Sequence, residues 1–260
     1  MDVSLRSLMQ NCFDVDMSAD RSLLRRMFGF RRSLVPPDPT GAAASVSVRQ
    51  LINDIDGDHI HLNVIRVGFD TFTATQNDTA LIDIDYSIFR VRNIFRTRGI
   101  GVGRVQHYVV DDADANGFAD INGADEAEDL WQAFSVRNDG IDAFVVRTIT
   151  GLLGLSPVPG DCDIDSKDDG CVAGGVDNGP EGMSRTFAHE IGHFLGLPHN
   201  HNALPAGPCP ATNAGQNNLM AQTGCTPVVG GVRDVRNSVL LTAAQGNTMD
   251  DHCTIQSPCP

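Results

Sequence analysis

The stretch His189-Glu190-Ile191-Gly192-His193-Phe194-Leu195-Gly196-Leu197-Pro198-His199 places three histidines at fixed intervals, with a glycine before the last of them. Residues four apart on an α-helix lie about 40° apart around the axis and about 6 Å apart along it, so His189 and His193 can direct ring nitrogens at a single ion. Gly196 tolerates the positive φ of a sharp turn, which would bring His199 back to the same ion. The spacing therefore predicts a helix that ends in a tight turn, with three imidazoles facing one ion.

The same helix has an apolar side. Met183, Phe187, Ile191 and Phe194 form a stripe along it, and Ile191 lies about 200° around the axis from His189. We expect the helix to bury this stripe in the core and to present its polar groups on the opposite side.

The chemistry of three neutral imidazoles is that of a catalytic zinc site, because a fourth ligand position stays open for water. Zinc lowers the pKa of that water towards about 7, and Glu190, next to His189, can take the proton. The resulting nucleophile attacks a carbonyl carbon, and Glu190 returns the proton to the leaving amine. Acid and base catalysis of this kind typically contributes about 10² to 10⁴ in rate.

A known family carries this pattern. His189-Glu190-x-x-His193-x-x-Gly196-x-x-His199, followed by Asn218-Leu219-Met220-Ala221 as a Met-turn, resembles the metzincin zinc peptidases. The resemblance implies a sheet whose edge strand binds extended substrate, an active-site helix ending at Gly196, and Met220 beneath the zinc. It is specific over residues 187 to 222.

Among the subfamilies, the chain is most similar to pappalysin-type or reprolysin-like enzymes. Gln222 stands two residues after Met220, so the tyrosine ligand of astacin-like and serralysin-like members is absent.

The sequence thus predicts a zinc-dependent metalloendopeptidase with Glu190 as general base and His189, His193 and His199 as zinc ligands. Two alternatives stay open: a zinc-binding interaction or toxin-like protein without peptidase turnover, and a zinc amidase that acts on cell-wall amides. The motif specifies carbonyl chemistry, whereas the loops select the substrate. We expect His201 to face solvent or to support the ligands, because the spacing from Gly196 favours His199 as the third ligand.

A weaker motif concerns calcium. Asp112, Asp114, Asn116 and Asp120, with a glycine after Asn116, reproduce the first nine positions of a calcium loop. Position twelve is Gly123 instead of the bidentate glutamate. Two interpretations follow, a calcium site formed by these four residues and an Asp-rich turn without metal, and the missing ligand favours the second.

Composition limits the partners. The chain has 260 residues, 41% of them apolar, and a formal net charge of -14. This charge opposes binding to phosphate backbones, so we expect a peptide or protein substrate and no nucleic acid. No apolar run approaches the roughly 18 residues of a transmembrane helix. We expect a monomer.

The cysteines indicate an oxidising compartment. Six of the 7 cysteines fall in the last hundred residues, which predicts disulfides and a secreted, extracellular protein, although residues 1–10 lack the apolar stretch of a signal peptide. Closeness in sequence suggests Cys162 with Cys171 and Cys209 with Cys225, among 15 connectivities for six thiols. Cys12 is then left over, as an unpaired or intermolecular cysteine or, as the resemblance to metzincins implies, as a latency switch whose thiolate occupies the open zinc position.

The domain plan has two parts. Residues 1–40 form an N-terminal segment, interpreted as a pro-segment or as a small packing helix over 21–32, and residues 41–260 form the catalytic domain. The fold class is α+β: one mixed, twisted β-sheet with packed helices, then the active-site helix and a loop-rich, disulfide-containing C-terminal subdomain.

Within this plan, alternation predicts a β-hairpin that joins a strand from Ser45 to a strand near 60–67. An amphipathic helix follows, capped at Asp78 or Thr79 and ended by Gly99, and two further strands cover 102–110 and 141–149. The expected apolar positions of this helix are Leu81, Ile84, Ile88, Val91 and Phe95.

Overall fold

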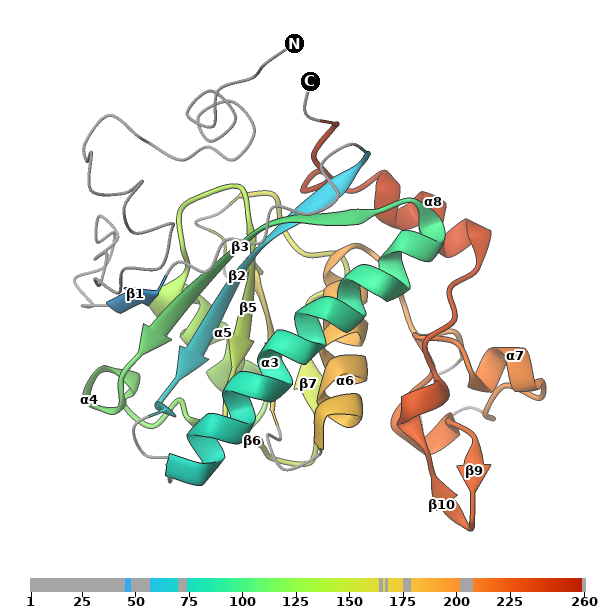
Figure 1. The fold of residues 1–260 in the computed structure, drawn as a ribbon, viewed down its shortest axis with the longest axis horizontal. Helices are drawn as coiled ribbons and strands as arrows, with labels where there is room; N and C mark the ends of the chain where they lie inside the picture. Colours follow the sequence, from blue (N-terminus) through green and yellow to red (C-terminus); the bar gives the residue numbers. More distant parts are fainter. Residues whose placement is uncertain are drawn as a thin grey trace.

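The computed structural model describes residues 45–47, 57–69, 74–163, 166, 168–174, 179–201 and 208–258. Their centre is a six-stranded sheet of order β1-β3-β2-β5-β8-β7 (Figure 1). The inner pairs are parallel, whereas β1 and β7 run antiparallel to their neighbours, so the predicted mixed sheet is confirmed. Its strands are β1 (Ser45–Ser47), β2 (His59–Val67), β3 (Gly101–Val110), β5 (Ile141–Val145), β7 (Gly154–Leu155) and β8 (Gly170–Ala173).

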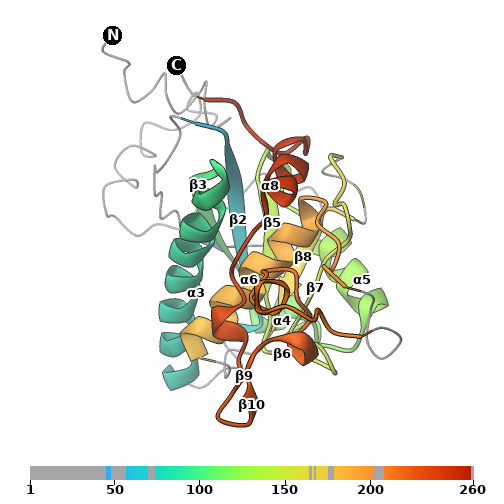
Figure 2. The same ribbon diagram turned by 90° about the vertical axis from the view of Figure 1, so that its right-hand side faces the viewer.

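Helices cover both faces of the sheet (Figure 2). Helices α3 (Ala74–Phe95) and α6 (Gly179–Phe194) pack on one face, and α5 (Ala124–Phe134) packs on the other. The remaining elements are short: η2 (Arg96–Arg98), α4 (Asp112–Ala115), β4 (Asp120–Ile121), β6 (Thr148–Ile149), α7 (Asn213–Gln216), η4 (Thr223–Cys225), β9 (Val228–Val229), β10 (Val232–Arg233), η5 (Val235–Asn237) and α8 (Ala243–Asp250). Most of these follow α6, which agrees with the predicted loop-rich C-terminal region.

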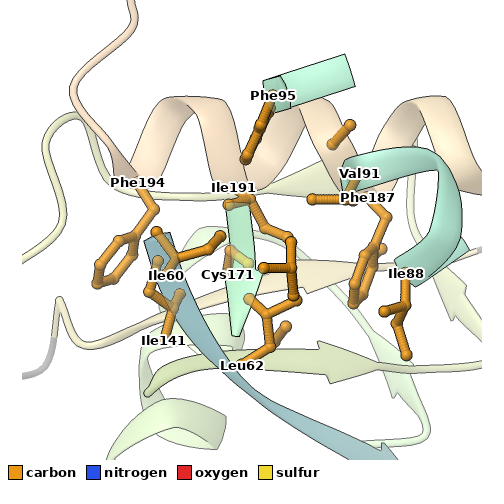
Figure 3. Close-up of a cluster of buried hydrophobic side chains, with 14 of the residues drawn as sticks. Ile60, Leu62, Ile88, Val91, Phe95, Ile141, Cys171, Phe187, Ile191 and Phe194 are labelled. Atoms are coloured by element: carbon orange, nitrogen blue, oxygen red, sulfur yellow. The ribbon is translucent and has the colours of Figure 1, made fainter. Parts of the chain in front are cut away.

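The core that positions α6 lies between this helix, α3 and the sheet (Figure 3). The predicted stripe is confirmed, since Met183, Phe187, Ile191 and Phe194 are all buried. Every residue of α6 from Gly182 to Phe194 is buried, which makes the helix a rigid support for any side chain that it carries. The stripe meets side chains of α3 and of the strands, among them Ile88, Val91, Phe95, Ile60, Leu62 and Ile141.

The predicted hairpin is wrong. Strand β1 pairs antiparallel with β3, and β2 lies between β3 and β5, parallel to both. A parallel neighbour requires a crossover connection, which α3 supplies between β2 and β3. Alternation of apolar residues reports that a strand is half-buried but does not report which strand lies beside it.

The first long helix starts earlier than predicted, at Ala74, and Gly99 ends it after the η2 turn with a φ of 84°. Ile84, Ile88, Val91 and Phe95 are buried as expected, but Leu81 is 40% exposed. Ala80 is buried in its place, and a small side chain there lets the helix lie close to the core.

The strand predicted over 141–149 is divided. Strand β5 ends at Val145, and β6 pairs with β4 outside the main sheet. The side chain of Arg147 donates to the carboxylate of Asp120, which holds the chain on β4 instead of β8.

One predicted disulfide is confirmed and one is wrong. Cys209 is bonded to Cys225, but Cys162 is bonded to Cys253, 91 residues away. Cys171 is a free thiol on β8 and points into the core beneath α6, away from solvent (Figure 3). Sequence proximity misleads here because β8 directs this side chain to the buried face.

Several predictions lie outside the described residues: the segment 1–40 with its helix over 21–32, and Cys12. Among the described residues, no helix combines the length and the apolar character needed to cross a membrane.

Candidate active site

The three histidines of the motif converge at the end of α6. The Nε2 atom of His199 lies 3.3 Å from that of His189 and 3.2 Å from that of His193. His189 and His193 are buried, and His199 is half-buried. One ligand atom from each residue lies within 4.8 Å of the others, so all three rings face one point.

This spacing fits a zinc ion. Bonds of about 2.0–2.1 Å in tetrahedral geometry place two ligand nitrogens about 3.3 Å apart, which is the separation observed. Zinc is therefore compatible with this donor set without any movement of the rings.

The hydrogen bonds of two of the rings also favour a metal ion at this point. His189 Nδ1 lies 2.7 Å from the carbonyl oxygen of Leu219, and His193 Nδ1 lies 2.6 Å from that of Leu197. A carbonyl only accepts, so both Nδ1 atoms carry the proton and both Nε2 atoms present a bare lone pair in the neutral rings. His199 Nε2 can donate to only one of them, so at least one close pair lacks a proton. A cation at the centre satisfies all three nitrogens.

Burial keeps the rings neutral. It lowers the pKa of His189 well below its usual range and lowers the pKa of His193. Burial also lowers the pKa of His199 to about 4. Neutral imidazole is the form that binds a metal, so the folded chain holds all three side chains ready for an ion.

The turn after α6 has the predicted geometry. Gly196 has a φ of 90°, a conformation that disfavours any side chain. Its N–H donates to the carbonyl of His193, and the N–H of Leu197 donates to that of Gly192, which closes the helix as a C-cap. This cap reverses the chain so that His199 reaches the two histidines of the helix.

Glu190 follows His189 directly on α6 and is buried, with 5% of its surface exposed. Burial raises the pKa of this carboxyl group to about 8, although the nearby Arg185 opposes the shift. Strand β7 at the sheet edge lies against the carboxyl group: a Cβ at Gly154 would lie 2.5 Å from Glu190 Oε1. The space that Glu190 occupies therefore exists because residue 154 is a glycine.

Met220 lies in the predicted turn and is fully buried against α6. A Cβ at Gly192 would lie 3.0 Å from its sulfur, so the helix and the turn approach closely at the residue before His193. The side-chain oxygen of Asn218 accepts from the N–H of Met220, which holds the turn in shape.

The other histidines stay apart from the trio. His201 Nε2 contacts Gln222 Oε1 at 3.2 Å, and its ring centroid lies 6.1 Å from that of His199. His252 lies near the sulfurs of Cys162 and Cys253, but these are joined to each other as a disulfide and offer no thiolate to a metal.

The residues of the calcium motif do not gather into a site. Asp112 and Asp114 lie in the short helix α4, and Asn116 ends it with a φ of 45°. The carboxylate of Asp120 accepts from Arg147 and from Thr148 Oγ1 instead. Among the described acidic, histidine and cysteine side chains, the groups close enough to share a metal do not include these aspartates, so the structure does not support calcium here.

Sequence reasoning missed two residues of the site, Gly154 and Arg185. Arg185 is buried on α6, and its guanidinium donates to the carbonyls of Leu219 and Ala221. Its position four residues before His189 could have indicated it, because residues i and i+4 share a helix face. No local signal marks Gly154, which reaches Glu190 only through the sheet.

Neither a protein-family model nor a curated protein matches the sequence. The fold is similar to the crystal structure of archaemetzincin from Methanopyrus kandleri, with a TM-score of 0.41 and 16% identity over 73% of this chain and 93% of that chain. It is also similar to metalloproteinase-II from Bacteroides fragilis, with a TM-score of 0.45 and 13% identity over 95% of this chain and 67% of that chain. Both are similarities of fold at low identity.

Proposed function

We propose that this chain is a zinc-dependent metalloendopeptidase that hydrolyses peptide bonds in extended chains. The observation that carries the proposal is the convergence of three imidazole Nε2 atoms at the spacing of ligands around a tetrahedral ion. The buried Glu190 is the next residue after the first of these histidines. His189, His193 and His199 would hold the ion, and His199 is the partly exposed member of the three.

Zinc bound to these histidines would lower the pKa of a coordinated water and polarise the scissile carbonyl. Glu190 would accept a proton from the attacking water at its carboxylate and pass it to the nitrogen of the leaving amine. Burial raises the pKa of Glu190 to about 8, and a zinc cation at the three histidines would lower it towards the carboxylate form that accepts the proton.

The sheet edge supports an extended substrate. Strand β7 pairs with β8 on one side only within the described sheet, so its other side is an edge with backbone groups available for a peptide strand. Gly154 of this strand touches Glu190, so a peptide paired to β7 would pass close to the proposed base.

Two finer assignments complete the proposal. Disulfides at Cys162–Cys253 and Cys209–Cys225 support secretion into an oxidising compartment. Gln222 contacts His201 at the place where a tyrosine ligand would stand, which supports the pappalysin-type or reprolysin-like resemblance.

The proposal is tested by metal removal and by one substitution. We expect a chelator to abolish cleavage of unfolded casein and added zinc to restore it. Glu190→Gln keeps the shape of the side chain and removes the base, so kcat should fall by a factor of about 10² to 10⁴ while metal analysis finds the zinc content unchanged. Glu181→Gln, on the first turn of the same helix and partly exposed, is the matched control and should retain activity.

The outcomes separate the alternatives. Zinc binding without cleavage of casein or of cell-wall amides would identify a binding protein, and cleavage of the amides alone would identify an amidase. Full peptidase activity in Glu190→Gln would remove this residue from the mechanism.

A further inference from the structure

Arg185 is an unusual residue for the middle of a packed helix. It is 3% exposed, and burial lowers the pKa of its guanidinium to about 10. Its guanidinium donates to two main-chain carbonyls, from Nη2 to Leu219 O at 2.9 Å and to Ala221 O. A buried cation costs several kcal/mol of desolvation, so a hydrophobic side chain of similar size would serve packing alone at least as well.

The turn at 218–221 has its other main-chain groups bonded elsewhere. The N–H of Leu219 donates to Leu240 O, and the N–H groups of Met220 and Ala221 donate to Asn218. The carbonyl of Met220 accepts from the N–H of Asn200, next to His199. The carbonyls of Leu219 and Ala221 face α6, and Arg185 is the donor that they share.

A second anchor holds the turn from the opposite side. The side-chain amides of Asn218 and Gln245 bond to each other in both directions, at 2.8 and 3.0 Å. Gln245 belongs to the capping box of α8 with Thr242. The turn should therefore keep its fold without Arg185, but the position of the Leu219 carbonyl relative to α6 should not stay fixed.

The Leu219 carbonyl also sets the orientation of a proposed zinc ligand. It accepts from His189 Nδ1 at 2.7 Å in addition to Arg185, so both lone pairs of one oxygen are used. We propose that Arg185 is a positioning residue: by clamping the turn at 219–221, it fixes the ring of His189 towards the metal. This inference rests on the proposed zinc site and adds a residue that acts through the turn rather than by touching the ion.

The positive charge of Arg185 should by itself weaken the binding of a zinc cation. Arg185 is a cation close to the histidines and disfavours further positive charge there. Removal of that charge alone should strengthen the binding of a divalent cation. A loss of zinc affinity in its absence must therefore come from lost positioning or from lost stability.

The test measures zinc affinity of the full chain by competition with a chromogenic chelator, without any peptide substrate. Arg185→Met, which keeps the apolar length and removes the donors, should weaken zinc binding by a factor of about 10 to 100. Arg185→Lys should recover most of that loss, because one ammonium group can donate to both carbonyls. The visible spectrum of the cobalt-loaded protein should change in the Met variant and return towards that of the parent chain in the Lys variant.

A matched control separates positioning from stability. Arg104, on β3, is also a buried arginine, and its side chain donates to Asn138 and Asp139 instead of the turn at 218–221. Arg104→Met should lower stability without changing zinc affinity. If Arg185→Met does not fold, Arg185→Gln, whose shorter amide cannot reach both carbonyls, replaces it with the same expectation.

Zinc affinity in Arg185→Met equal to or above that of the parent chain would overturn the inference and leave the proposed function intact. An equal loss in Arg104→Met would also overturn it. A parent chain that binds no zinc would contradict both the positioning role of Arg185 and the proposed function. A parent chain that binds zinc but cleaves no peptide would contradict only the proposed peptidase activity.

Discussion

At the scale of single residues, the candidate site depends on two glycines as much as on the residues whose side chains form it. Gly154 leaves the volume that the Glu190 carboxyl group fills, and Gly192 lets Met220 approach the helix. Both glycines have ordinary negative φ values, so space and not backbone conformation explains them. An added methyl group at either place acts directly on a group of the candidate site.

Gly154→Ala should therefore lower peptidase activity selectively. Its Cβ would lie 2.5 Å from Glu190 Oε1 and would displace the carboxyl group, and a displacement of about 1 Å can cost a factor of about 10² in rate. Zinc affinity should not change, because the three atoms nearest to the added Cβ all belong to Glu190 and none to a proposed zinc ligand. Gly57→Ala is the control, since the atom nearest to its added Cβ would be Gly99 O at 3.8 Å. Equal kcat values in the parent chain and in Gly154→Ala would show that the Glu190 carboxyl group accommodates the added methyl group without a loss of function.

At the scale of elements, the short parallel pair of β4 and β6 shows how an acidic motif is used for structure. Asp120 binds Arg147 through two oxygens and also accepts from Thr148, so it fastens the segment after β5 to the loop after α4. The hydrogen bond from Arg147 lowers the pKa of Asp120. The structure therefore gives the Asp120 carboxylate a structural role.

The pairing predicts a pH dependence of stability. Because the folded pKa of Asp120 lies below its unfolded value of about 3.9, the bond stabilises the fold above that pH and is lost as the pH falls through the folded pKa. Asp120→Asn should lower the free energy of unfolding at neutral pH by no more than about 1 kcal/mol, since the pair is partly exposed. Denaturant titrations at neutral pH and near pH 2 check this, and a difference of the same size at both would contradict it.

At the scale of the whole molecule, the C-terminal segment 252–256 contacts the start of β2 and the end of α6. Gln256 bonds to the backbone of His59 in β2, and the ring of His252 lies on Phe194 at the end of α6. The Cys162–Cys253 disulfide ties this segment to the loop between β7 and β8. The end of α6 is thus held by residues far from it in sequence.

The two disulfides should contribute unequally to stability. The bond between Cys162 and Cys253 spans 91 residues, and the bond between Cys209 and Cys225 spans 16. In the chain-entropy model, the difference in loop length corresponds to about 1.5 kcal/mol. Replacing Cys162 and Cys253 by serine should therefore lower the free energy of unfolding more than replacing Cys209 and Cys225, as measured by urea denaturation. A larger loss for the shorter loop would show that local packing outweighs chain entropy here.

Features that depend on short spacings could be predicted from the amino-acid sequence. The helix of His189 and His193, its buried stripe and the turn at Gly196 follow from helical periodicity and from the φ preference of glycine. The Cys209–Cys225 bond joins near neighbours and was also predicted.

The neighbours of these local elements, in contrast, follow from the packing of the whole chain. The pairing of β1 with β3, the bond from Cys162 to Cys253 and the contact of Gly154 with Glu190 join residues that no local pattern relates. The donation from Arg185 to the Leu219 carbonyl joins residues 34 positions apart. The physical reason is that periodicity specifies which face of an element is buried, whereas packing of the whole chain selects the partner that buries it.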